Sequence, residues 1–287
     1  MTELQTQLGA LLPIVLLCLG LLVGSFLNVV IYRLPLMMES RWRRDCCELL
    51  EVSAEKEAEP LNLATPNSHC PHCKTSIKPW QNIPVISYLM LRGKCASCAA
   101  PISLRYPVLE LVTGLMTLAL AFLFEISPEL LGAVLLTWAL IALTMIDVDH
   151  QLLPDDITLP LMWLGLTFNL FGIYTTLFDA VVGAMAGYLS LWSIYWAFKI
   201  ITGKEGMGYG DFKLLAALGA WMGWQALPMI ILLSSVVGIV GGVTLMVLKG
   251  RGKEVPIPFG PYLAMAGWIA LLWGDTIINR YTAMLAP

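Results

Sequence analysis

The stretch TWALIALTMIDVDH, residues 137–150, decides how this chain must fold, because ten uncharged residues run directly into the carboxylate of Asp147. An uncharged run of this kind belongs in a hydrocarbon environment, and an acid at its edge is costly there and usually serves a function. A second such acid, Asp211, closes GYGD (208–211) and opens the apolar segment FKLLAALGAWMGW. Two carboxylates at water-accessible edges of apolar spans could divide the acid and base roles of a hydrolysis.

Composition places most of the chain in a membrane. Of its 287 residues, 58% are hydrophobic and only 13% are charged, which is about half the charged share of a soluble domain. The small net charge and the lack of a basic stripe give no reason to expect nucleic acid as a partner. The expected fold is therefore an all-α polytopic membrane protein, a bundle of about eight transmembrane helices with a zinc-stapled cytoplasmic insert.

Eight apolar runs have the length of a membrane span. They cover about 10–32, 107–124, 130–146, 157–175, 178–200, 211–226, 228–248 and 257–278. The first run is expected to be an uncleaved anchor, because no basic segment precedes it and no small-residue cleavage site follows it. The chain is thus expected to divide into a first transmembrane anchor (1–32), a cytoplasmic insert (33–106) and a seven-helix membrane core (107–287).

The distribution of basic residues predicts the orientation. Nearly all of the 17 Lys and Arg residues lie in segments 33–106, 199–213 and 249–253. With eight spans these segments share one face, which the positive-inside rule assigns to the cytoplasm. Asp147 and Asp211 then lie at that same face, as a shared site requires.

A paired cysteine motif marks the insert. Cys70-Pro-His-Cys73 and Cys95-Ala-Ser-Cys98 are two C-x-x-C knuckles whose spacing is typical of a structural four-thiolate zinc site. The alternative is a pair of disulfides, which a reducing cytoplasm disfavours.

Acids near Asp147 have ordinary explanations. Asp155 and Asp156 precede an apolar span, where they suit helix capping and compensation of the helix dipole. Asp149 lies farther from the apolar run than Asp147 and is expected to be solvated or supporting.

Asp211 also has a structural alternative, because Gly-Asp before a helix is an ordinary N-cap. The glycines at Gly208 and Gly210 permit close backbone approach or positive φ. Either property suits a segment that must let a peptide come near.

Further blocks complete the pattern: GSFLNVVIYRLP (24–35), RYPVLE (105–110), EGMGYGDFK (205–213) and PFGP (258–261). Together with the cysteine knuckles and the segment from Asp147 to Asp155, they resemble the type IV prepilin leader peptidases. These are bifunctional enzymes that also N-methylate their product. The resemblance extends over nearly the whole chain.

The resemblance implies a membrane aspartic peptidase core in 107–287 whose catalytic pair is Asp147 and Asp211. It implies prepilin and pseudopilin substrates, whose basic leader stays in the cytoplasm while an apolar helix sits in the bilayer. Cleavage would follow a glycine, and the new N-terminal residue, usually phenylalanine, would be methylated from S-adenosylmethionine. The implied location is the bacterial inner membrane, with the active site facing the cytoplasm.

No motif identifies the methyl-transfer site, since G-x-G-x-x-G on a strand–helix unit is missing from the sequence. By resemblance this site involves the insert and its junctions with the bundle. Glu110 is a candidate for binding the new amine, and a pair with Arg105 is the alternative.

Two other classes of protein compete with an enzyme. A transporter or channel predicts acids near the middle of spans and internal repeats, and a structural assembly subunit would make both aspartates incidental.

Overall fold

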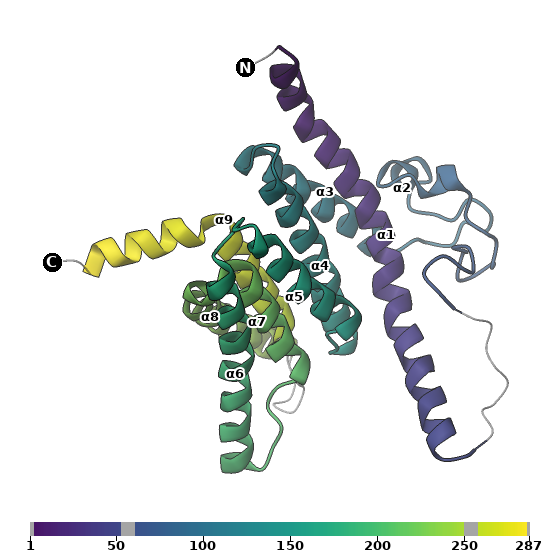
Figure 1. Ribbon diagram of the computed structural model, residues 1–287. Coiled ribbons are helices and arrows are strands. Elements are labelled where there is room, and N and C mark those ends of the chain that lie inside the picture. Colours follow the sequence, from purple (N-terminus) through teal and green to yellow (C-terminus); the bar gives the residue numbers. More distant parts are fainter. Residues whose placement is uncertain (1–2, 53–60, 250–257, 286–287) are drawn as a thin grey trace. The chain divides into compact units, whose positions relative to one another are not determined.

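The structure is a computed structural model that describes residues 3–52, 61–249 and 258–285 (Figure 1). Its helices are α1 Glu3–Leu49, α2 Ile86–Met90, α3 Arg105–Leu123, α4 Pro128–His150, α5 Asp155–Leu170, α6 Leu177–Thr202, α7 Tyr209–Met222, α8 Leu227–Lys249 and α9 Gly260–Leu285. Strand pairing in these ranges is limited to two isolated bridges in the cysteine-bearing loops. The predicted all-α class is confirmed.

Each of the eight expected spans overlaps one helix, and α2 is the short extra helix of the insert. Among the described residues, α1, α3, α4, α6 and the segment Trp224–Gly241 in and before α8 are long and apolar enough to cross a membrane. Helices α5 and α7, with 16 and 14 residues, are shorter than a typical span of about 20 residues. The number of crossings therefore stays a prediction.

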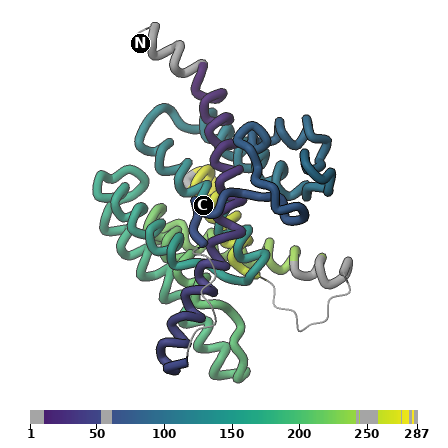
Figure 2. The backbone as a smooth tube through the Cα atoms, turned by 90° about the vertical axis from the view of Figure 1, so that its right-hand side faces the viewer, coloured from purple at the N-terminus to yellow at the C-terminus, as the bar shows by residue number. Residues whose placement is uncertain are grey.

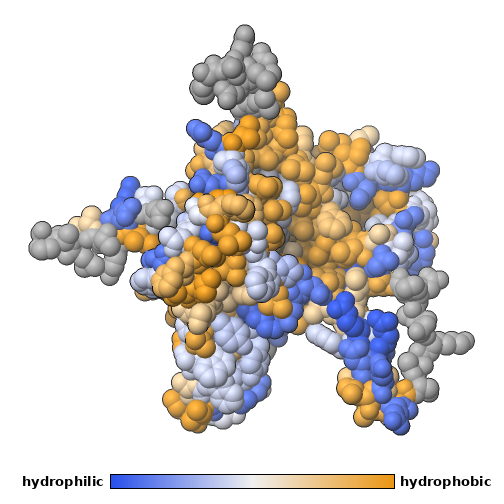
Figure 3. All heavy atoms as spheres, in the orientation of Figure 1, coloured by the Kyte–Doolittle hydropathy of each residue, from blue (hydrophilic) through white to orange (hydrophobic). Residues whose placement is uncertain are grey.

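Helix α1 does not end near residue 32 but continues to Leu49 as one purple rod in both backbone views (Figures 1 and 2). The added residues are mostly good helix formers such as Leu, Met, Glu and Arg. Large apolar side chains such as Leu22 are exposed in the first part of α1, whereas many hydrophilic side chains gather on its last turns, beside a few apolar ones (Figure 3). The helix thus continues from an apolar segment into one that carries most of its charged residues.

The chain folds as two compact units, Met1–Ile126 and Ser127–Pro287. In the first unit α3 packs along α1, and glycines allow the close approach. A Cβ atom at Gly20 would lie 2.7 Å from Thr117 Oγ1, and one at Gly24 would lie 2.8 Å from the Glu110 Cα. This is the Gly-x-x-x-Gly packing of membrane helices. The second span therefore packs with the first one.

The second unit is built around α7. Its side chains Phe212, Leu215 and Trp221 are completely buried, and α6 lies against it through Gly187, where a Cβ atom would be 2.6 Å from the Leu215 carbonyl oxygen. Asn169 of α5 donates to the Trp221 carbonyl at 2.9 Å, near the end of α7. A short helix rich in Gly and Ala can thus form the centre of the bundle, because its neighbours pack closely around it.

Candidate functional site

Asp147 lies in the last turn of α4 and is buried, with 5% of its surface exposed. The helix ends at Gln151, a left-handed residue whose N–H bonds the Asp147 carbonyl oxygen. The backbone of Gly260, at the start of α9, lies directly against the Asp147 carboxylate. Asp149 is exposed. The two acids of this turn therefore occupy different environments. The sequence likewise favoured Asp147 as the catalytic candidate and Asp149 as a solvated or supporting residue.

Asp211 is the third residue of α7, and Gly208 is the N-cap, so Asp211 is not itself the capping residue. Its carboxylate accepts the backbone N–H of Gly208, as an acid at this position does in a capping box. Asp211 is also buried, with 7% exposed. This local structural role leaves Oδ1 of the Asp211 carboxylate without a hydrogen bond.

Each of these aspartates keeps one oxygen without a protein partner. Among the buried side-chain atoms of the described residues, only Asp147 Oδ2 and Asp211 Oδ1 lack a hydrogen bond. The two carboxylates also lie close enough for their charges to interact directly. A buried acceptor without a donor costs about 1–3 kcal/mol, so such atoms usually have a catalytic or binding reason. Two adjacent acids with free oxygens can hold and activate a water molecule.

Leu153, in the loop after α4, packs against two glycines of the site. A Cβ atom at Gly210 would lie 2.7 Å from Leu153 Cβ, and one at Gly260 would lie 2.6 Å from Asp147 Oδ2 and 3.1 Å from Leu153 Cδ2. At Gly208 the nearest atom would be 3.7 Å away, an ordinary contact. None of these three glycines has positive φ. Close approach therefore explains Gly210 and not Gly208.

Gly260 was given no role from the sequence, although the PFGP block that contains it was noticed. Its position beside Asp147 depends on the packing of α9 against α4, which a local pattern does not reveal.

The four cysteines come together in the first unit as the knuckle spacing predicted. Their sulfur atoms lie within 4.8 Å of one another, with Cys70 and Cys98 at 3.8 Å and Cys73 and Cys95 at 4.0 Å. Ligands at about 2.3 Å from a tetrahedral zinc are about 3.8 Å apart, whereas bonded sulfurs are about 2.05 Å apart. All of these thiols are free. The cluster fits a metal ion and not a pair of disulfides.

The electrostatics of the knuckles also suit a cation. Hydrogen bonds from Thr75 lower the pKa of Cys73 to about 6, so this thiol favours the thiolate form that binds metals. The N–H of Ala100 lowers the pKa of Cys98, but burial and the other three sulfurs outweigh it and raise that pKa to about 11. The four neighbouring thiols therefore do not all ionise unless a cation binds among them.

Two buried charged residues attach the insert to the helices of the first unit. Arg33 donates to the Asn62 carbonyl at 2.9 Å and the Pro66 carbonyl at 2.6 Å. Glu110 accepts the Val85 N–H at 2.8 Å and a hydrogen bond from Ser25. These Glu110 contacts support a structural role that neither of the sequence alternatives included.

Comparison with known proteins divides the chain at nearly the same place as the two compact units. The family profile described as Bacterial Peptidase A24 N-terminal domain matches residues 18–124, and that of the Type IV leader peptidase family matches residues 134–243. No solved structure matches the chain.

Curated relatives match along almost the whole sequence. A protein of Stutzerimonas stutzeri named prepilin leader peptidase/N-methyltransferase is 59% identical over 92% of each chain. Proteins of the same name are 57% identical in Pseudomonas aeruginosa, over 92% of this chain and 91% of the relative, and 47% identical in Legionella pneumophila, over 91% of each.

Proposed function

Since this chain belongs to the type IV leader peptidase family, we propose that it cleaves the basic leader from prepilins and pseudopilins at the cytoplasmic face of the inner membrane. We propose that it then methylates the new N-terminal amine from S-adenosylmethionine. The names of its relatives support both activities. The observation that carries the peptidase assignment is the pair of buried aspartates with free oxygens.

In the proposed cleavage, one aspartate is ionised and the other is protonated, because two close carboxylates do not readily share two negative charges. The ionised aspartate takes a proton from water as the water attacks the peptide carbonyl. The protonated aspartate donates to the carbonyl oxygen, and a proton then passes to the leaving amine. The backbone of Gly208 and that of Gly260 lie beside Asp211 and Asp147 and restrict how these carboxylates can turn.

The location of Asp147 and Asp211 supports the proposed position of the cleaved peptide bond. Asp147 ends α4 and Asp211 begins α7, so both lie at the ends of helices. A bond at the junction of a basic leader and an apolar helix would meet them there. The cytoplasmic orientation rests on the distribution of Lys and Arg in the sequence.

The first unit would hold the second activity and a structural zinc ion. Four cysteines leave no open ligand position for water, so zinc at Cys70, Cys73, Cys95 and Cys98 would stabilise the fold of the insert. Methyl transfer to an amine needs a neutral nitrogen, a sulfonium donor and a group that accepts a proton. The residues that provide these functions stay unassigned.

The direct test uses the purified full-length chain in detergent with a prepilin and labelled S-adenosylmethionine. We expect a cut at one bond, followed by label on the new N-terminal residue, as read by mass spectrometry. Intact prepilin after incubation with a folded chain would contradict the proposed function.

A further inference from the structure

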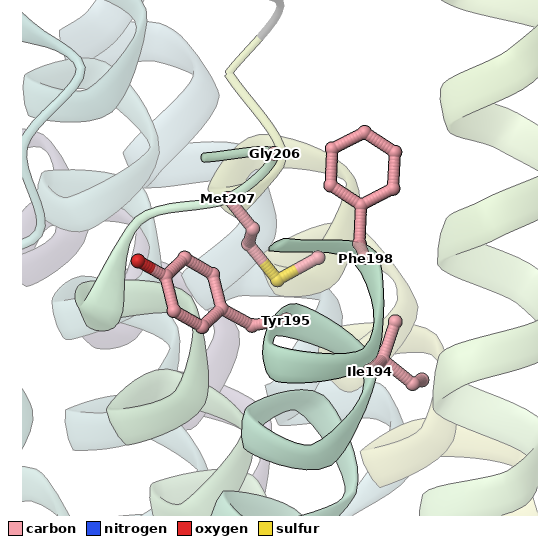
Figure 4. A pocket seen from close by; sticks show the side chains of 5 residues that line it. All are labelled: Ile194, Tyr195, Phe198, Gly206 and Met207. Atoms are coloured by element: carbon pink, nitrogen blue, oxygen red, sulfur yellow. The ribbon is translucent and has the colours of Figure 1, made fainter. Parts of the chain in front are cut away.

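A half-open apolar hollow of about 170 Å³ lies at the end of α6. Ile194, Tyr195 and Phe198 of α6 form one side, and Gly206 and Met207 of the following loop form the other. Figure 4 shows the Met207 side chain reaching between the rings of Tyr195 and Phe198. An apolar cavity of about 150 Å³ engineered in another protein binds benzene. The hollow thus has the size of one ring or one branched side chain.

The lining of the hollow packs against the turn that carries Asp211. The Tyr195 ring, itself buried, packs on the rings of Tyr209 and Phe212 with centroids 5.3 and 5.7 Å apart. These two residues flank Gly210 and Asp211 in the first turn of α7. Met207 directly precedes Gly208, whose N–H holds the Asp211 carboxylate. The lining of the hollow is therefore in direct contact with the turn that carries Asp211.

The loop that forms the second side is tied in place. Lys199 donates to Glu205 at 2.8 Å and to the Tyr195 hydroxyl at 3.2 Å. This hydrogen bond with Lys199 holds the pKa of Glu205 below its ordinary value. Gly206 lies so close to Phe198 that a Cβ atom would be 2.9 Å from the ring. The wall is thus formed before any ligand arrives, which reduces the cost of binding.

We propose that this hollow is a specificity subsite that takes one apolar side chain of the segment following the cleaved bond. The assignment rests on the proposed peptidase function and deepens it. Three observations support it: the apolar lining, a volume that fits a single side chain, and contact of the lining with the Asp211 turn. The polar groups of Lys199 and Glu205 lie beside the loop and not in the lining.

The test measures kcat/KM for prepilins in which each of the first four residues after the cleaved bond is replaced in turn by alanine. With the unchanged enzyme, one apolar position should show a loss of about tenfold, since removing a side chain from an apolar pocket has at least this effect. Ile194→Trp fills the hollow, so that same position should become insensitive while the other three keep their pattern. Phe198→Ala enlarges the hollow and should favour tryptophan over the natural side chain at that position.

Ile201→Trp is the matched control, because Ile201 is exposed at the same end of α6 and does not line the hollow. It should reproduce the scan of the unchanged enzyme. Equal scans for Ile194→Trp and Ile201→Trp would overturn the subsite. A loss that is uniform over all four positions, as expected for a hollow that holds a lipid chain, would overturn it too. Failure of the unchanged enzyme to cut any prepilin would instead contradict the proposed function itself.

Discussion

At the scale of single residues, the site depends on two buried carboxylates that each keep one oxygen without a hydrogen-bond partner. The Gly260 backbone lies against the Asp147 carboxylate and the Gly208 backbone lies near that of Asp211, yet Asp147 Oδ2 and Asp211 Oδ1 stay unpaired. A purely structural acid would have both oxygens satisfied, because each unpaired one lowers stability. This arrangement favours a catalytic role over the capping role that the sequence also allowed.

We predict that Asp147→Asn and Asp211→Asn each reduce cleavage by at least about a thousandfold, because an amide cannot exchange a proton with water or the leaving group. Asp149→Asn should retain most of the activity, since Asp149 is exposed. Initial rates on one prepilin measure all three variants, and thermal unfolding confirms that each is folded. If Asp149→Asn were the more damaging change, the catalytic partner of Asp211 would have been wrongly chosen.

Alanine substitution should separate the three glycines of the site. At Gly210 and Gly260 an added Cβ would meet Leu153 or Asp147 at 2.7 or 2.6 Å, so each variant should lose activity and about 1–3 kcal/mol of stability. Gly208→Ala keeps its N–H and meets nothing closer than 3.7 Å, so it should remain active. Cleavage rates and chemical denaturation are the measurements. Equal damage at all three positions would mean that Gly208 is needed for its flexibility.

At the scale of helices, α5 and α7 are joined by an ion pair beside the aspartates. Lys213 lies one half-turn beyond Asp211 and bonds both carboxylate oxygens of Asp155 at 2.7 Å. Asp155 is the first residue of α5, after the N-cap Pro154, so the capping explanation offered from the sequence is incomplete. The pair links the segment that follows Asp147 to the helix that carries Asp211.

This ion pair should matter more for activity than for stability. Its side chains are 29% and 50% exposed, and pairs of this kind contribute less than about 1 kcal/mol. We predict that Lys213→Met lowers kcat severalfold with little change in unfolding temperature, because the spacing of the aspartates loosens. The exchanged variant, Asp155→Lys with Lys213→Asp, should recover part of the loss. Absence of any recovery would show that Lys213 acts on the substrate or on Asp211 directly.

The sequence predicted the positions of the helices better than it predicted their ends and the contacts between them. Apolar runs located every long helix, because hydrocarbon length constrains such runs strongly. The apolar run 10–32 did not predict that α1 continues to Leu49, since hydropathy reports where a helix leaves the apolar phase and not where it stops. The contacts Gly260–Asp147 and Lys213–Asp155 were also missed, because they join segments distant in the sequence. The motif residues Asp147, Asp211 and the four cysteines were found because their chemistry is local.

At the scale of the whole molecule, the cysteine cluster belongs to one unit and the aspartate pair to the other. We predict one zinc ion per chain, bound by the four sulfurs, and measurable by elemental analysis of the purified protein. Cys73→Ser should reduce metal content and expose residues 61–101 to protease, because metal binding contributes to folding of the loops that hold it. Cys18→Ser, outside the cluster, is the control. A zinc content near zero in an intact, active chain would exclude the site.

The same division predicts that the two activities separate by mutation. Asp147 and Asp211 lie in the unit Ser127–Pro287, whereas the insert lies in Met1–Ile126. Methylation needs a free amine, so on intact prepilin the aspartate variants should show neither activity. Given a pilin that is already trimmed, Asp147→Asn should methylate it from S-adenosylmethionine at a rate within about twofold of the unchanged enzyme, because no residue of the first unit has been altered. Methyl incorporation is followed with labelled donor, and metal content confirms that the variant's first unit is intact. Loss of methylation in that folded, metal-loaded variant would mean that both reactions use the aspartates, and the second site would then have to lie beside α4 and α7.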